Sequence, residues 1–225
     1  MHLYEARPEG RARAGIVVIQ EAFGVNEHIQ DVTRRFAARG FHAVAPEIFH
    51  RAGGGTAPYT DFSKVLPLFR GLSDEGFLMD VDAACAHLAS AGFGPESIGL
   101  VGFCMGGRVT FLVALHRTLG AAVGFYGGGI VSARRPGFAP LIDDAPKLRT
   151  PWLGLFGDRD AGIPVEDVER LRAALAPLSV PTQIVRYPDA GHGFHCDDRD
   201  AYHADSAADA WTRTLDWFEK HLAER

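Results

Sequence analysis

The sequence predicts an α/β fold in which a mostly parallel sheet carries helices on both faces. Short β-branched apolar runs alternate with segments of helical periodicity along the whole chain, which is the pattern of a wound α/β sheet. Neither a linker nor an internal repeat divides the 225 residues, and 47% of them are hydrophobic, enough for a large core. We therefore expect one domain spanning residues 1–225.

The first half of the chain predicts two strands and two helices. The runs GIVVIQ (15–20) and FHAVAP (41–46) are short and apolar, which favours buried strands. Between them, residues 26–40 repeat apolar side chains at helical spacing and end on a glycine, which is typical of an amphipathic helix. A glycine-rich loop is expected around residues 51–61, followed by a long helix over 74–92.

The second half continues the alternation. A helix is expected to begin at Met105, another to cover residues 164–178, and a last one to cover 205–222. Between and before these helices we expect four buried strands, SIGLVGF (97–103), AAVGFYG (121–127), TPWLGLFG (150–157) and TQIVRYP (182–188).

Composition excludes several classes of partner. The 23 basic and 28 acidic residues give a net charge of −5, with no basic run of the kind that nucleic-acid binding uses. No apolar stretch reaches the roughly 18 residues of a membrane span, and the polar opening has no apolar leader segment. Three cysteines are an odd number, which indicates free thiols. We expect a cytoplasmic protein that binds neither nucleic acid nor membrane.

A cysteine lies between two glycines where a strand meets a helix. The pattern Gly102-x-Cys104-x-Gly106 has the spacing of a nucleophile elbow, in which small neighbours let strand and helix approach closely. A thiol at a helix N-terminus is also activated by the helix dipole. The competing interpretation of Cys104 is a small buried hydrophobe, which is common for a lone cysteine.

Candidate partners follow the next strands. Asp158 and Asp160 come just after one strand and His192 after the next, in the order nucleophile, acid, histidine that this kind of elbow uses. Each also has a structural interpretation, as turn or cap residues and as a loop histidine. Parallel strands end at one edge of a sheet, so a Cys-His-Asp triad is the favoured hypothesis. His192, His195 and Cys196 match no common zinc spacing, so we expect neither a metal nor another cofactor.

Five segments together resemble the dienelactone hydrolase (carboxymethylenebutenolidase) family, cysteine hydrolases of the α/β-hydrolase superfamily. They are QEAFGVN (20–26), VGFCMGG (101–107), GFYGGG (124–129), FGDRDAGIP (156–164) and YPDAGHGFH (187–195). The resemblance extends over nearly the whole chain. It implies a single-domain α/β-hydrolase fold and a carboxylic ester hydrolase that opens a lactone or cleaves a small ester.

The resemblance also implies roles for particular residues. By position, Cys104 resembles the nucleophile, His192 the triad base and Asp160 the triad acid. Glu21 resembles a glutamate that contacts the resting thiol and takes part in its activation, and the amides of Ala22 and Met105 resemble the two oxyanion donors.

Asp160 is preferred to Asp158 because the family's acid follows its glycine, here Gly157, by three residues and precedes its proline, here Pro164, by four.

The substrate is less well indicated than the chemistry. Family members hold the carboxylate of dienelactone with arginines, and Cys196 occupies one of those positions here, while Lys64 or Arg70 could replace the other. Phe103, Tyr126, Phe194 and the loop around Tyr59 are candidate pocket walls and equally candidate core residues.

Three functional hypotheses remain at this point. The first is a cysteine-dependent lactone or ester hydrolase, with dienelactone as the family's substrate and another small ester or lactone as the main variant. The second is another reaction of an elbow cysteine, such as amide transfer or cleavage, against which the QEAFGVN segment and the histidine after the acid weigh. The third is a binding or redox-sensing protein in which Cys104 is present without turnover. The sequence makes no prediction of oligomeric state.

Overall fold

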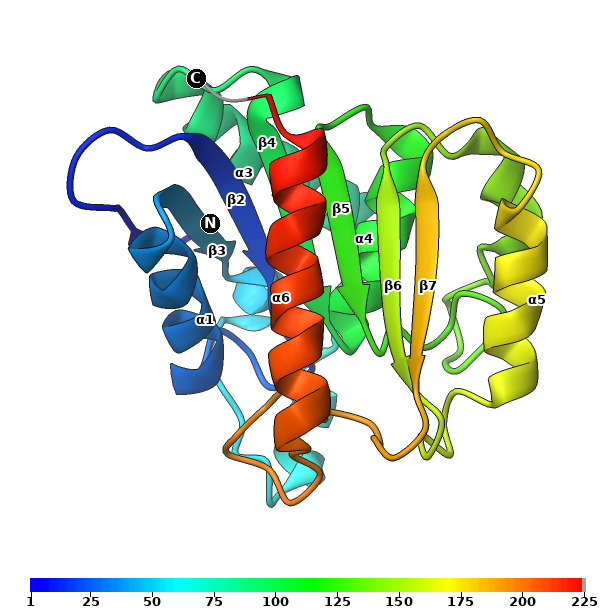
Figure 1. Ribbon diagram of the computed structural model, residues 1–225. Coiled ribbons are helices and arrows are strands. Elements are labelled where there is room, and N and C mark those ends of the chain that lie inside the picture. Colours follow the sequence, from blue (N-terminus) through cyan, green and yellow to red (C-terminus); the bar gives the residue numbers. More distant parts are fainter. Residues whose placement is uncertain (224–225) are drawn as a thin grey trace.

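A seven-stranded sheet in the order β1-β3-β2-β4-β5-β6-β7 forms the centre of the computed structural model, which describes residues 1–223 (Figure 1). Strand β1 pairs with β3 in the antiparallel direction, and all other neighbours are parallel. The strands are β1 (Leu3–Ala6), β2 (Ala14–Ile19), β3 (Phe41–Pro46), β4 (Ile98–Phe103), β5 (Ala121–Phe125), β6 (Trp152–Gly157) and β7 (Thr182–Tyr187).

Helices cover both faces of the sheet. Figure 1 shows α1 and α6 in front of it and α3 and α4 behind it, and α5 packs against β7 at the end of the sheet. The helices are α1 (Glu27–Ala38), α2 (Val65–Leu68), α3 (Asp74–Ser90), α4 (Met105–His116), α5 (Val165–Leu175) and α6 (Ala204–His221). Short 3-10 turns are η1 (Ile48–Ala52), η2 (Phe62–Lys64), η3 (Pro95–Ser97) and η4 (Ile142–Lys147).

Most predicted elements are confirmed, with ends shifted by one to three residues. The predicted mostly parallel α/β sheet is present, and the Asn26 side chain caps α1 by accepting from the amide of Ile29 at 3.2 Å. Strand β1 in the polar opening was not predicted. Nor were the helical turns η1, η2 and α2 between β3 and α3, η3 before β4, and η4 before β6. Of the predicted domain, the last two residues lie outside the described residues.

The central strands are buried on both faces, which explains their continuous apolar runs. Every residue of β2, β3, β4, β5 and β6 is buried, as expected for parallel strands covered by helices. The register pairs Ile19 with Gly102 and Gly102 with Gly124, so β2, β4 and β5 end at the same edge of the sheet. That edge is the lower one in Figure 1.

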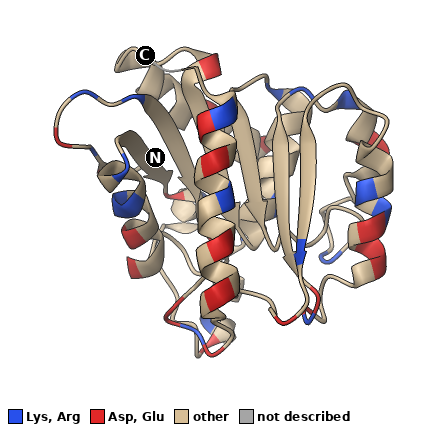
Figure 2. Cartoon of the chain, in the orientation of Figure 1, with Lys and Arg blue, Asp and Glu red and all other residues tan. Residues whose placement is uncertain are grey.

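Charges are spread over the outer surfaces. In Figure 2, acidic and basic residues occur together along α6 and also on α1 and α5. Within residues 1–223, no helix is both long and apolar enough to cross a membrane.

Candidate active site

Cys104 occupies a strained turn between β4 and α4. Its φ of 55° and ψ of −112° lie outside the regions that non-glycine residues favour. A Cβ on Gly102 would collide with the backbone of Gly106, and one on Gly106 would collide with the carbonyl oxygens of Ile19 and Gln20. Both glycines therefore let α4 begin directly against the ends of β4 and β2, as the elbow pattern predicts.

His192 lies between Cys104 and Asp160. Its Nε2 is 3.1 Å from the Cys104 sulfur, and its Nδ1 is 2.6 Å from Oδ2 of Asp160. The amide of Gly162 donates to the other carboxylate oxygen of Asp160 at 2.9 Å. The three side chains come from the ends of β4, β6 and β7. The structure thus brings together the thiol, imidazole and carboxylate predicted from the sequence.

The local electrostatics favour a charged imidazole. Burial acts to lower the pKa of His192, but the negative charge of a Cys104 thiolate and the hydrogen bond to Asp160 outweigh it and raise the pKa to about 10. Burial likewise acts to raise the pKa of Asp160, while its hydrogen bond and charge interaction with His192 lower it overall. The surroundings of His192 therefore favour the protonated, positively charged ring.

Asp158 serves another purpose. Its carboxylate accepts two hydrogen bonds from the Arg186 guanidinium, both at 2.7 Å. This bidentate pair leaves Asp160 as the carboxylate that contacts His192.

Two amides next to the thiol suit oxyanion binding. Met105 is the first residue of α4, where an amide has no carbonyl partner within the helix. Ala22 follows the end of β2, and both residues line the same cavity as Cys104. The side chain of Gln20 fixes this loop by accepting from the amide of Ile48 at 3.1 Å.

Glu21 does not contact the resting thiol, contrary to the expectation from the resemblance. It is fully buried, with one oxygen accepting from the Tyr59 hydroxyl at 3.0 Å and the other 3.4 Å from Arg199. Tyr59 in turn accepts from the Cys196 thiol at 3.3 Å. The guanidinium and the phenol satisfy the buried carboxylate.

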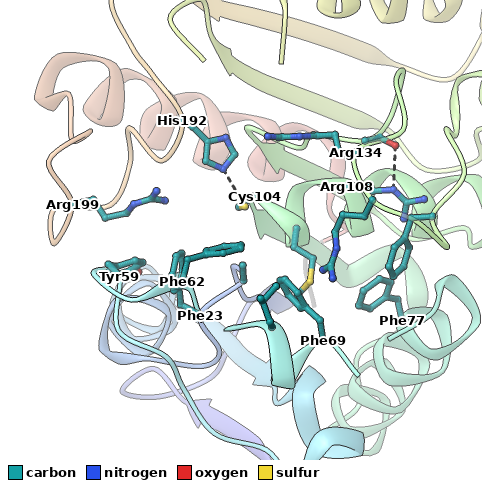
Figure 3. A pocket seen from close by; sticks show the side chains of 17 residues that line it. Phe23, Tyr59, Phe62, Phe69, Phe77, Cys104, Arg108, Arg134, His192 and Arg199 are labelled. Carbon is teal, nitrogen blue, oxygen red and sulfur yellow. Dashed lines mark hydrogen bonds between the residues drawn. The ribbon is translucent and has the colours of Figure 1, made fainter. Parts of the chain in front are cut away.

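A cavity of about 550 Å³ opens beside the thiol. Figure 3 shows Cys104 and His192 at its side, with aromatic rings from several elements around it. Its aromatic and aliphatic wall is made by Ala22, Phe23, Tyr59, Phe62, Leu66, Phe69, Phe77, Met105 and Phe138. The loop around Tyr59 therefore forms part of the pocket, as expected.

The three aromatic residues predicted as pocket walls lie elsewhere. Phe103, Tyr126 and Phe194 are fully buried and do not line the cavity. Side chains alternate across a strand, so the residue before Cys104 points away from it, and Phe103 stacks on Phe125 at 4.7 Å. Tyr126, at a φ of 38°, lies behind His192 with its ring 5.1 Å from the imidazole.

Four arginines line the cavity, and none of them was predicted from the sequence as a substrate-binding residue. Neither Lys64 nor Arg70 reaches it. The arginines that do are Arg108, Arg134, Arg135 and Arg199. Sequence reasoning missed them because no motif contains Arg134, Arg135 or Arg199, and Arg108 reads as an ordinary helix residue.

Possible metal ligands lie away from this site. Within residues 1–223, the group of side chains able to share an ion consists of Glu5, His42 and His87, from β1, β3 and α3. Both histidines contact one oxygen of Glu5, which also accepts from Arg7 at 2.9 Å. A guanidinium on that oxygen opposes the binding of a second cation.

The chain is similar to known proteins in sequence and in structure. A sequence model described as "Dienelactone hydrolase family" matches residues 1–222. A protein of Escherichia coli (strain K12), named provisionally as a carboxymethylenebutenolidase, is 39% identical over 233 residues, covering 98% of this chain and 83% of the relative. The carboxymethylenebutenolidase of Rhodococcus opacus is 31% identical over 211 residues, covering 92% of this chain and 81% of the relative.

A solved structure is similar over the same range. The crystal structure of a Klebsiella pneumoniae protein, assigned provisionally as a dienelactone hydrolase, superposes with a TM-score of 0.89 at 38% identity. The match covers 97% of this chain and 92% of that one.

Proposed function

The chain belongs to the dienelactone hydrolase family, and from this premise we propose that it hydrolyses a small ester or lactone through the thiol of Cys104. His192 and Asp160 complete the triad. The observation that carries the proposal is the pair of contacts made by His192, 3.1 Å to the Cys104 sulfur and 2.6 Å to Asp160. A nucleophile, its base and an orienting carboxylate need this chain of contacts.

In the acylation step, the Cys104 thiolate attacks the carbonyl carbon and forms a C–S bond. The electron pair of the carbonyl moves to oxygen, and the Ala22 and Met105 amides stabilise that oxyanion. When the tetrahedral intermediate collapses, the C–O bond to the alcohol breaks and the His192 imidazolium gives the leaving oxygen a proton. A lactone keeps its alcohol tethered to the acyl group, whereas an open ester releases it.

Deacylation reverses the direction of proton transfer. Neutral His192 takes a proton from water, and the resulting hydroxide attacks the thioester carbon. The C–S bond then breaks, which regenerates the thiolate opposite an imidazolium and releases a carboxylic acid. Asp160 keeps Nδ1 protonated and stabilises the positive ring throughout.

The role of Glu21 in thiol activation stays a prediction. The resemblance implies that the Glu21 carboxylate contacts the resting thiol. Its hydrogen bond with Tyr59 and its ion pair with Arg199 support a resting state in which it contacts these two side chains instead. A substrate that draws Arg199 toward itself would weaken the 3.4 Å ion pair and free the carboxylate. Thiol activation would then follow substrate binding.

The names of the relatives suggest the first substrate to test. The Rhodococcus opacus relative is a carboxymethylenebutenolidase, so the wild-type protein and Cys104→Ala are assayed on cis- and trans-dienelactone and on a panel of neutral esters. We expect turnover that depends on Cys104. Turnover of neutral esters alone would support catalysis by the triad and would exclude dienelactone as the substrate. If no ester or lactone is turned over, while Cys104 reacts readily with peroxide, the sensor hypothesis replaces this one.

The cytoplasmic location also stays a proposal. It rests on Cys85, Cys104 and Cys196, which are all free in the structure. A thiol nucleophile needs a reducing compartment to stay reduced. Retention of the protein in the cytoplasmic fraction of cells tests this.

A further inference from the structure

The cavity beside Cys104 is larger than a small lactone needs. Its volume of about 550 Å³ lies within the roughly 300–1,000 Å³ of pockets that enclose drug-sized ligands. A five-membered lactone ring with a short side chain fills only part of such a space and leaves the remaining apolar side chains in contact with water. The cavity therefore favours a substrate that carries more apolar surface.

Five phenylalanine rings form an aromatic wall in this cavity. The ring centroids of Phe23 and Phe62 lie 6.3 Å apart, and those of Phe62 and Phe69 lie 6.4 Å apart, both in edge-to-face arrangements. Phe77 and Phe138 form a stacked pair with a centroid distance of 5.8 Å. All five residues line the cavity. Rings arranged in this way offer both edges and faces to an apolar group, and to another ring in particular.

Two apolar side chains of the cavity are exposed to solvent. In the part of the chain that the structure describes, the exposed large apolar residues are Met1, Phe62, Leu66, Met79 and Tyr202. Phe62 and Leu66, with exposed fractions of 55% and 58%, line the cavity, and the other three do not. Apolar surface exposed at a pocket is typical of a binding site, because a ligand that covers it removes that surface from water.

Two arginines of the cavity are paired with carboxylates of the protein. Arg108 makes a bidentate pair with Asp74, at 2.6 and 3.0 Å. Arg199 lies 3.4 Å from a carboxylate oxygen of Glu21. Because their charges are compensated within the protein, these two guanidinium groups need no anion from the substrate.

The other two arginines also interact with groups of the protein. The guanidinium carbon of Arg135 lies 3.7 Å from the centroid of the Phe69 ring, which is a cation–π contact. Burial acts to raise the pKa of Asp160, while its contact with His192 and the positive charge of Arg134 act to lower it. Arg134 therefore favours the ionised form of the Asp160 carboxylate. What the protein leaves uncovered in the cavity is apolar.

The direction of proton transfer in the proposed mechanism places the acyl group on the side of this wall. His192 gives its proton to the leaving alcohol, so the alcohol lies on the His192 side of the Cys104 sulfur. The acyl group then extends away from His192. Figure 3 shows Phe23, Phe62 and Phe69 across Cys104 from His192.

We propose that the aromatic wall, together with the exposed side chains of Phe62 and Leu66, binds a bulky apolar acyl group, so that the substrate is an ester with an arylalkanoyl chain. This inference rests on the proposed function and specifies its substrate class. Removal of the aryl group and of the exposed side chains from water supplies the binding free energy. A small lactone leaves the wall uncovered and gains little of it.

The kinetic test varies the acyl group and keeps the leaving group. Its substrates are p-nitrophenyl acetate and p-nitrophenyl 4-phenylbutanoate. We expect wild-type kcat/KM to be at least about ten-fold higher for the 4-phenylbutanoate, and this ratio to fall at least about three-fold in Phe62→Ala/Leu66→Ala because less apolar surface is buried with the substrate. The proposal is overturned if the wild type shows no preference for the 4-phenylbutanoate, or if the double variant keeps the wild-type ratio.

Met79→Ala is the matched control. Met79 is 58% exposed, as Leu66 is, but does not line the cavity. Its removal deletes a similar surface side chain and should keep the wild-type ratio. Exposed side chains contribute little to stability, so all these variants should fold, which circular dichroism checks. An equal fall of the ratio in Met79→Ala would overturn the proposal.

A binding measurement separates this inference from the proposed function. Calorimetry with the Cys104→Ala protein compares 4-phenylbutanamide with acetamide, which are both uncharged. We expect the larger amide to bind with a negative heat-capacity change, and to bind more weakly after Phe62→Ala/Leu66→Ala. This result supports the apolar site even if no ester is hydrolysed. If the larger amide does not bind, or if its affinity is equal with and without the two substitutions, the inference is rejected whether or not esters are hydrolysed.

Discussion

The Nε2 atom of His192 lies 3.1 Å from the sulfur of Cys104. Because Nδ1 of the same ring contacts Asp160, both ring nitrogens have a partner, and these two contacts fix the orientation of the ring beside the thiol. The strained backbone of Cys104 brings the sulfur to that nitrogen. The relationship depends on residues 88 positions apart in the sequence.

Asp160→Asn should abolish most activity while leaving the fold intact. An amide at this position can donate to Nδ1, which favours the wrong tautomer and removes the charge that stabilises the imidazolium. We expect kcat to fall by about 10³- to 10⁴-fold, by analogy with other triads. Steady-state kinetics and circular dichroism of the purified variant measure both properties.

Asp158→Asn is the matched control. It removes a carboxylate two residues away that pairs with Arg186 instead of His192. This partly exposed ion pair should contribute at most about 1 kcal/mol to the free energy of unfolding. If kcat falls further in Asp158→Asn than in Asp160→Asn, then Asp160 is not the triad acid.

The pKa of His192 should fall when the thiol is removed. The wild-type value is raised to about 10, mainly by the charge of the Cys104 thiolate and by Asp160 acting against burial. Cys104→Ala deletes the thiolate, so the imidazolium loses an attractive interaction and releases its proton at lower pH. NMR titration of the ring should show a midpoint near pH 10 in the wild type and a lower one in the variant.

His195 provides an internal control for that titration. Burial lowers its pKa to about 3, so its ring should stay neutral between pH 5 and 10 in both proteins. The same midpoint for His192 in the wild type and in Cys104→Ala would mean that no thiolate faces the ring.

The elements that the sequence predicts well are those with a strong periodic pattern. Strands β2 to β6 are buried on both faces and read as continuous apolar runs. Strand β1 was missed because it is a four-residue edge strand, LYEA, with a mixed composition. The turns between β3 and α3 were missed because each is too short to show a helical period.

The close approach of Cys104, His192 and Asp160 was easier to predict than the pocket. The three residues follow β4, β6 and β7, parallel strands that end at the same edge of the sheet. The cavity wall instead comes from segments around residues 23, 59–69 and 128–138, together with residues of α3 and α4. Their approach depends on tertiary packing that no local pattern records. Proximity in sequence was misleading for Phe103, which adjoins the nucleophile yet points to the opposite side.

Gly106→Ala should destabilise the protein strongly. The added methyl group would lie against the carbonyl oxygens of Ile19 and Gln20, so α4 must move away from β2. Overpacking of this kind costs about 1–3 kcal/mol, or more where backbone must shift. Urea unfolding of Gly106→Ala measures the loss.

Gly191→Ala is a control for that measurement. It lies in the histidine loop, where a new Cβ would meet only the carbonyl oxygen of Arg159, at 3.9 Å. We expect a change below about 1 kcal/mol in the free energy of unfolding. Comparable losses in the two variants would show that α4 can shift without strain, and that the glycine at the elbow has no steric purpose.

A double-mutant cycle on Glu21 and Arg199 should separate the two possible roles of the glutamate. If Glu21 serves only to hold Arg199, then Glu21→Gln, Arg199→Gln and the double variant should lower kcat/KM by similar amounts, because each breaks the same 3.4 Å ion pair. If Glu21 also activates the thiol, Glu21→Gln should lower the rate of thioester formation in a single turnover by at least about ten-fold more than Arg199→Gln does. Rapid-quench measurement of the first turnover distinguishes these outcomes. We expect the second, because Glu21 is a fully buried carboxylate beside Ala22, and Ala22 and Cys104 line the same cavity.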